Sequence, residues 1–438
     1  FNLTDVFPDF DLRDIYPAGF SPQFKQDDSD NALNMGLKGT MFNDLDWDMS
    51  AGFGQNSIEY KMSQSINASL GSTSPTSFSI GELIQSETNL NADFNYIWSS
   101  PILFEDANVA FGLEYRKETY EIKPGELASY EIGAGASAGL PSGSNGFPGF
   151  SPSQSGESSQ HSESVYMDVD LPMSESLNMG LATRYEKYSE YGNGKLTGKL
   201  STRYEVNNDL ALRATLSTGF KAPTPGQLFS ERTSQGLDTN TLNIYTSGRF
   251  SPEGAIARVI SDRADVSINP LEAEESSNIS AGIVYRNNNG FHSSVDIYQV
   301  DVDNRLSTSE TFTISDSEKV QLVGLNVVGG ESITRVNFFQ NDFDTRTTGV
   351  DLVLGYTANV NSGSLSLTSA LNHNKTEVLN GSLVDNVTTR NRFEKLLPQN
   401  TASFTANYDL DIISLMARVR YYGSWTDYSG NSDGDVFQ

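Results

Sequence analysis

The first candidate for chemistry is the stretch at residues 135–139, Gly-Ala-Ser-Ala-Gly, which fits the G-x-S-x-G pattern around the nucleophilic serine of many hydrolases. That serine requires a sharp turn between a strand and a helix, together with a histidine and an acid. Ser137 instead lies in GAGASAGLPSGSNG, a low-complexity stretch with no helical pattern behind it. We therefore interpret the motif as a loop and do not expect a hydrolase.

Metal ligands are the second possibility. Cysteine is absent, which excludes disulfides, thiolate metal sites and a cysteine nucleophile. Residues 301–304, Asp-Val-Asp-Asn, are similar to the start of a calcium loop, but the required glycine and later glutamate are missing. The three histidines show no i,i+4 or carboxylate-linked spacing. We expect neither a metal site nor a cofactor. The histidines are His161, His292 and His373.

Charge is the third source of function. The chain has 56 acidic and 29 basic residues among 438, a formal net charge of −27, which would repel a phosphate backbone. We therefore exclude nucleic acid as a partner. An acidic N-terminal stretch could attract a cationic substrate or calcium, but we favour a solvated outer loop. Its acids are Asp5, Asp9, Asp11, Asp14, Asp27, Asp28 and Asp30.

The elements that must position any site follow a period of two, which is typical of strands. Leu210, Leu212, Ala214 and Leu216 alternate with Ala211, Arg213, Thr215 and Ser217. The same alternation recurs at residues 33–41, 165–171, 177–182 and 415–422. About 14 such segments are present, no sustained helical period is found, and no stretch of 18 apolar residues could form a membrane helix. The fold class is therefore predicted to be all-β.

The polar face of these strands distinguishes a membrane barrel from a soluble sandwich, because it carries charged residues opposite an apolar stripe. A barrel in a bilayer has hydrocarbon on one side and water on the other. We expect Leu212, Leu216, Met179, Met35, Leu354 and Val419 to face lipid, and Arg213, Arg184 and Arg418 to face the lumen. The inward phase is also compatible with Arg203 and Arg286, and such arginines could bind carboxylates or sugars.

Connection lengths support a barrel, because short turns and long polar stretches largely alternate, as in outer-membrane barrels. Short turns are expected at 43–44, 172–176, 207–209, 287–290, 361–363 and 409–411. Long outer loops are expected at about 64–83, 121–160, 222–272, 305–335 and 374–395, with a shorter connection at 188–194. Residues 1–30 are expected to be an outer loop segment, and 31–438 a barrel portion.

Aromatic residues near strand ends predict a girdle at the membrane interface, although strands are generally rich in aromatics. They are Trp47, Tyr60, Tyr96, Trp98, Tyr115, Tyr185, Tyr188, Tyr285, Tyr356, Tyr421 and Trp425. The long segment 222–272 is the one we expect to touch substrate. It mixes Arg249, Arg258 and Arg263 with Phe229, Tyr245 and Phe250.

Several stretches, in order along the chain, resemble the barrel of TonB-dependent outer-membrane receptors. They are FPGFSP at 147–152, LALRATLSTGFKAPTP at 210–225, NPLEAEESSNISAGIVYR and VDIYQVDVDNRL within 270–306, and NFFQNDFDTRTTGVDLVLGY at 337–356. The resemblance covers about residues 107–438, with a weaker likeness at 16–100. It implies a partial transmembrane antiparallel β-barrel, with about 14 of about 22 strands in this chain.

The resemblance also implies a function and partners. The plug domain and its TonB box are not matched, nor is the family's closing strand, so we expect a middle portion of the barrel cut at both ends. The parent would import a scarce nutrient across the outer membrane of a Gram-negative bacterium without covalent chemistry, so we expect no catalytic residue and no enzymatic activity. The inward arginines could alternatively pair with carboxylates of the plug. Its partners would be TonB, through the plug, then lipopolysaccharide and lipid, and a small-molecule or oligomeric nutrient such as a siderophore, cobalamin, oligosaccharide or peptide. Alternatives are a passive porin or adhesin-like barrel, and a secreted all-β carbohydrate-binding protein.

Overall fold

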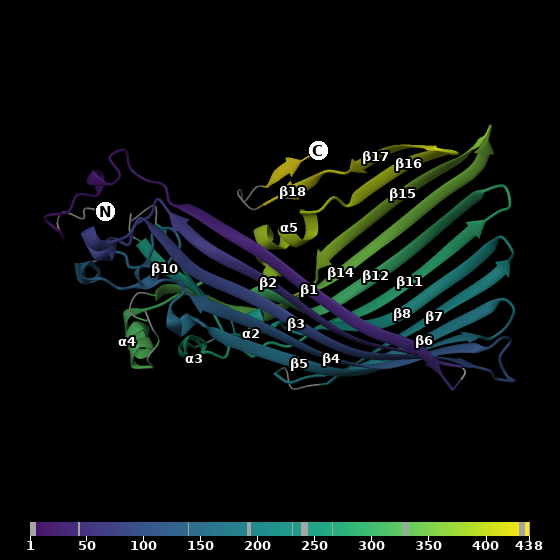
Figure 1. The fold of residues 1–438 in the computed structure, drawn as a ribbon, viewed down its shortest axis with the longest axis horizontal. Coiled ribbons are helices and arrows are strands. Elements are labelled where there is room, and N and C mark those ends of the chain that lie inside the picture. Colours follow the sequence, from purple (N-terminus) through teal and green to yellow (C-terminus); the bar gives the residue numbers. More distant parts are fainter. Residues whose placement is uncertain are drawn as a thin grey trace.

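Fourteen long strands form the body of the protein in this computed structural model (Figure 1). The structure describes residues 6–42, 44–138, 140–190, 194–229, 231–237, 244–264, 266–325, 327, 330, 333–428 and 434–437. The long strands are β1 (Gln23–Met41), β2 (Leu45–Ser63), β3 (Ser77–Trp98), β4 (Ala107–Pro124), β5 (Gly156–Pro172), β6 (Leu177–Tyr188), β7 (Lys195–Asn207), β8 (Leu210–Lys221), β11 (Glu274–Arg286), β12 (Phe291–Thr308), β14 (Ile333–Val360), β15 (Gly363–Val378), β16 (Asn400–Leu410) and β17 (Ile413–Tyr422). The expected number of about 14 barrel strands is confirmed.

Each long strand pairs antiparallel with the next, and β8 pairs with β11 and β12 with β14. The result is one curved antiparallel sheet, the wall of a partial β-barrel (Figure 1). Within the described residues, β1 pairs only with β2 and β17 only with β16. The strands contain 10 to 28 residues, whereas about 9–11 suffice to cross a bilayer. The longest strands therefore extend beyond the apolar layer.

The two faces of the sheet differ as the alternation predicts. Leu216 lies opposite Leu200 on one side and Ile279 on the other, and its exposed fraction is 50%. Leu212 lies four residues before Leu216 on the same face, whereas Arg213 points to the opposite face and pairs with Asp296. Apolar side chains thus form rows across the outer face, and charged side chains meet on the inner face.

Short and long connections lie at opposite ends of the strands. Figure 1 shows the hairpin turns at one end and α2, α3 and α4 at the other. The short connections are those between β1 and β2, then residues 99–106, 173–176, 208–209, 287–290, 361–362 and 411–412. The long ones are 64–76, 125–155, 222–273, 309–332 and 379–399, with 189–194 shorter. Asn43 and residues 191–193, parts of two expected connections, lie outside the described residues. Strand β1 begins at Gln23, within the segment 1–30 expected as loop.

The aromatic residues divide between the two faces. Tyr96, Tyr185 and Tyr356 are exposed on the outer face, as expected for a girdle. Tyr188 faces inward, is 5% exposed and accepts a hydrogen bond from Arg116. Tyr60 also packs inward, against Phe24 and the loop residues Phe147 and Phe150. A position near the end of a strand therefore does not decide whether a tyrosine faces lipid or the lumen. The face is set by the alternation of side chains along the strand.

The outer connections carry the short elements. The helices are α1 (Leu127–Tyr130), α2 (Pro225–Phe229), α3 (Ala255–Ser261), α4 (Asp316–Gly324) and α5 (Val387–Lys395). The 3-10 turns are η2 (Leu12–Asp14), η3 (Ala68–Thr73), η4 (Ala134–Ala138), η5 (Pro152–Gln154) and η6 (Ser382–Val384). The short strands are β9 (Arg232–Leu237), β10 (Ile244–Phe250), β13 (Phe312–Thr313), β18 (Trp425–Asp427) and β19 (Asp435–Phe437). None of the helices in the described part of the chain has the length and apolar character needed to cross a membrane.

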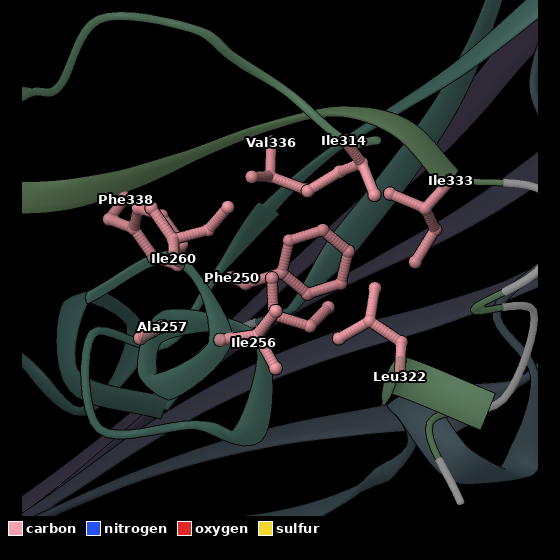
Figure 2. Packing of buried hydrophobic residues seen from close by; sticks show 10 residues of the cluster. Phe250, Ile256, Ala257, Ile260, Ile314, Leu322, Ile333, Val336 and Phe338 are labelled. Carbon is pink, nitrogen blue, oxygen red and sulfur yellow. The ribbon is translucent and has the colours of Figure 1, made fainter. Parts of the chain in front are cut away.

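The largest buried core lies in these outer connections. We call the unit formed by β9, β10, β13, the first residues of β14, α3 and α4 the outer cap. Strand β10 pairs antiparallel with β9 and parallel with β14. One face of this small sheet packs on the two helices around Phe250 (Figure 2). The core residues are Phe250, Ile256, Ala257, Val259, Ile260, Ile314, Leu322, Ile333, Val336 and Phe338.

An arginine introduced on the outer face of the wall should destabilise the protein far more than one on the inner face. We expect Leu216→Arg to cost about 2–4 kcal/mol, because it places a charge in hydrocarbon near mid-height of the strand. Thr215→Arg, one residue away on the inner face, is the matched control and should cost much less. Denaturant titration of both variants folded into lipid vesicles measures the difference. Equal destabilisation would mean that the two faces are wrongly assigned.

Candidate ligand-binding site

Several arginines of the inner wall are neutralised by carboxylates of the wall itself. Arg184 Nη2 lies 2.9 Å from Glu114 Oε2, and its Nε lies 3.0 Å from Glu186 Oε2. Arg116 reaches the other oxygen of Glu186 at 3.4 Å and donates to the Tyr188 hydroxyl at 2.7 Å. The small residues Ser162 and Ser164 of β5 lie between Arg116 and Tyr188 and between Glu114 and Glu186, so the long side chains can reach across the intervening strand. The carboxylates satisfy charge without any ligand.

Arg213 of β8 is also paired with a carboxylate across an intervening strand, nearer to the end of the wall that carries the short turns. It lies opposite Gly282 of β11, which in turn lies opposite Asp296 of β12. Arg213 Nε donates to Asp296 Oδ1 at 2.7 Å across the glycine. A Cβ at Gly282 would displace that oxygen from its present position, so glycine leaves room for the pair as it stands. Arg203 pairs with Glu205 of its own strand at 3.0 Å.

The two remaining arginines expected in the lumen are placed differently. Arg418 donates to the hydroxyl of Thr405 at 3.0 Å, and Arg286 is exposed at the end of β11 beside a short turn. The inner wall therefore offers few unneutralised cations at the positions that the alternation indicated.

Segment 222–272, expected to touch substrate, uses two of its six singled-out residues, Phe250 and Arg263, to hold the outer cap together. Phe250 is in the core of the outer cap. Arg263 binds Glu318 of α4 with donor–acceptor distances of 2.6 and 2.8 Å. Arg258 is exposed on α3 and reaches the backbone carbonyl of Glu253. Phe229 ends α2. The side chain of Tyr245 lies outside the described residues.

Arg249 is the exception, because it lines a cavity of about 510 Å³ on the face of the cap sheet opposite the core. Arg232 of β9, Arg335 and Asn337 of β14, and Phe147 from the loop 125–155 line the same cavity. Its volume is in the usual range for small-molecule sites. We call it the arginine cavity.

Strand register explains how these side chains converge. Arg232 lies directly opposite Arg249, and Arg249 lies opposite Asn337, so the three form one row across β9, β10 and β14. Ser247 and Arg335 form the next row on the same face. A bulge at the start of the β10–β14 pairing shifts the register from Ile333 to Arg335. Both Ile333 and Val336 can therefore enter the core while Arg335 and Asn337 point to the cavity.

The electrostatics of the arginine cavity are unusual for so acidic a chain. The guanidinium of Arg249 lies 4.3 Å from the ring centre of Phe339. Burial lowers the pKa of Arg249, and the charge of Arg232 lowers it further. Burial raises the pKa of Glu231, the residue that precedes Arg232 in the sequence. Arg232 donates to the Tyr120 hydroxyl at 3.1 Å.

The other sequence candidates lie apart from the arginine cavity. Ser137 belongs to η4, its side chain is not described, and Gly139 lies outside the described residues, as does Asp5. His161 stacks on Tyr115, and Asp301 pairs with Arg346. Among the described residues, no three histidine, aspartate or glutamate side chains are grouped closely enough to hold a metal ion.

Sequence reasoning missed Arg232, Arg335 and Asn337. A weak signal was present, because residues 246–250 (TSGRF) and 334–338 (TRVNF) alternate polar with apolar over one short span each. Such short segments do not show from the sequence that they pair with each other, so the shared row of side chains becomes visible only in the structure.

Comparison with known proteins identifies related structures. The family model described as TonB dependent receptor-like, beta-barrel, matches residues 2–437. The siderophore receptor PirA from Acinetobacter baumannii is 12% identical with a TM-score of 0.59, covering 94% of this chain and 55% of its own. The RagAB peptide importer is 14% identical with a TM-score of 0.58, and the match covers 92% of this chain and 48% of its own. The FrpB iron transporter from Neisseria meningitidis is 10% identical with a TM-score of 0.57, and the match covers 92% of this chain and 52% of its own. No curated protein sequence matches.

These comparisons confirm the resemblance found in the sequence, and at such identities the structural likeness concerns the fold. The chain spans about half the length of these three structures.

The outer cap should loosen in acid because of Glu318. Its hydrogen bonds with Arg263, and then those with Ser315, lower its pKa from the ordinary value of 4.5 to about 2. A pKa lower in the folded state stabilises at neutral pH, and that contribution is lost as pH falls from about 4.5 through 2. Hydrogen exchange at α4, corrected for the intrinsic effect of pH, should rise over that window.

Glu318→Gln is the matched variant, since glutamine preserves the capping box with Ser315 but carries no charge. It should exchange faster at neutral pH and show little added change in acid. The same pH response in both proteins would contradict the role of the Arg263–Glu318 pair.

Proposed function

Because the chain belongs to the family of TonB-dependent receptor-like β-barrels, we propose that it forms the wall and outer loops of a receptor that captures a nutrient outside the cell and imports it. The single observation that carries the proposal is the family match over residues 2–437. Members of this family are receptors and transporters of the outer membrane of Gram-negative bacteria rather than enzymes. We accordingly assign no covalent chemistry to this chain.

The proposed division of labour follows from the two ends of the wall. Residues 31–438 would form the barrel portion, with the long connections outside the cell and the short turns in the periplasm. The outer cap and the loop 125–155 would contact the nutrient first, because they enclose the arginine cavity at the outer end. The apolar rows on the outer face would contact lipid, with lipopolysaccharide around the outer loops.

Energy coupling is the second part of the proposal. Transport would require a plug inside the barrel, and TonB would pull on it using the proton gradient of the inner membrane. The inner face suits this arrangement, since Arg184 and Arg213 are paired with carboxylates of the wall and present a polar, locally neutral surface there. The nutrient could be a siderophore, cobalamin, an oligosaccharide or a peptide. The related structures include a siderophore receptor and a peptide importer.

Binding and uptake by the full-length protein should separate when energy is withdrawn. In cells lacking TonB, or with the proton gradient collapsed, we expect uptake to stop while binding of the nutrient to the cell surface continues. A plugged lumen cannot pass solute by diffusion, whereas outer loops bind at equilibrium. Cells that express the receptor with TonB intact are the positive control.

A passive porin or adhesin-like barrel would behave differently. Uptake at an undiminished rate without TonB would establish a porin, and binding without any uptake in energised cells would establish an adhesin. Either result would replace the importer.

A further inference from the structure

The arginine cavity contains an arrangement that sheet proteins usually avoid. Arg232 and Arg249 lie directly opposite each other on paired strands, and like charges at such positions destabilise a sheet. Arg335 lines the same cavity from β14. The facing guanidinium groups of Arg232 and Arg249 thus meet in a chain whose net charge is −27, and a counter-charge to this pair is expected.

The described part of the chain supplies no such counter-charge to Arg249. None of the described side chains that line the cavity is an aspartate or a glutamate. The Nε atoms of Arg232 and Arg249 and the Oδ1 atom of Asn337 are buried, and each lacks a hydrogen-bond partner among the described residues. Buried polar atoms are normally paired, and leaving one unpaired is costly. Arg232, Arg249 and Asn337 therefore have capacity for a partner that the described residues do not provide.

A second cavity in the same protein shows the contrast. It has a volume of about 410 Å³ on the inner wall and also contains two arginines, Arg116 and Arg184. There Glu186 lies between them and binds both. In the second cavity a carboxylate thus holds both arginines, although the Nε of Arg116 also lacks a partner among the described residues, whereas no carboxylate lines the arginine cavity in the described part of the chain.

We propose that the arginine cavity binds an oxyanion of the imported nutrient, a carboxylate or a phosphate carried by a larger molecule. This inference rests on the proposed function, since it names the substrate class of that receptor. The planar fork of arginine matches both groups bidentately. An anion between Arg232 and Arg249 would turn their mutual repulsion into two attractions.

The other lining groups fit the remainder of such a molecule. The hydroxyl of Thr233 and the side-chain amide of Asn337 can bond to further oxygens, and the amide can rotate to donate. Phe147 offers an aromatic surface. A volume of about 510 Å³ exceeds that of a bare ion many times, since one water occupies about 30 Å³. A neutral sugar would leave the facing arginines unpaired, and a metal cation would be repelled.

Calorimetric titration of the purified full-length receptor tests this proposal. The probes are citrate for carboxylates, inorganic pyrophosphate for phosphates, and maltose as a neutral control, at constant chloride. We expect at least one anion to bind and maltose not to bind. Arg249→Gln and Arg232→Gln should each weaken anion binding about 10- to 100-fold, the usual range for losing a hydrogen bond to a charged group.

Two further variants control the result. Arg258→Gln removes an exposed arginine of α3 in the same segment and should leave binding unchanged. Arg249→Lys keeps the charge but loses the fork, and should bind more weakly than the parent and more tightly than Arg249→Gln. It also serves if the glutamine variant does not fold. The anion that binds more tightly identifies the oxyanion as carboxylate or phosphate.

The proposal is overturned if neither anion binds, if Arg258→Gln weakens binding as much as Arg249→Gln does, or if maltose binds and is displaced by neither anion. The titration needs neither TonB nor a membrane potential. Failure of anion binding would therefore contradict the anion site but not the proposed importer. Uptake independent of TonB would contradict the importer but not the anion site.

Discussion

The continuous ladder of backbone hydrogen bonds between antiparallel strands is the interaction on which the rest of the structure depends. Hydrocarbon offers no partner to an N–H or C=O group, so every crossing strand must be paired along its length. Pairing fixes the register, and register fixes which side chains share a row. The row of Leu200, Leu216 and Ile279 on one face and the row of Arg213, Gly282 and Asp296 on the other are two consequences of one register.

The outer cap uses the same rule outside the membrane. A small sheet again has an apolar face and a polar face, but its apolar face is covered by α3 and α4 rather than by lipid (Figure 2). Its polar face is then free to line a cavity. The pair between Arg263 and Glu318 joins the end of α3 to the start of α4, so the cap is held by both a core and an ion pair.

Sequence alone predicted the barrel wall well because each strand has lipid on one face and water on the other, so its residues alternate between apolar and polar. Alternation at Leu210–Ser217 gives the face of every residue there, and the loop lengths give the direction of the strands. The cavity could not be predicted in the same way. Arg232 and Asn337 are brought together by β10, which pairs in parallel with a strand far away in the sequence. The bulge near Ile333 also changes the phase, so the side on which Arg335 lies does not follow from counting.

A scan of spin labels along β8 tests the arrangement of the wall. The chain has no cysteine, so single cysteines at positions 210 to 217 can be labelled without background. Accessibility to oxygen, which is concentrated in hydrocarbon, should peak at Leu212, Ala214 and Leu216. Accessibility to a water-soluble nickel complex should be low at these positions. At Arg213 and Thr215 the accessibility to oxygen should be lower. A period near 3.6, or oxygen maxima at the odd positions, would contradict a membrane barrel with this register.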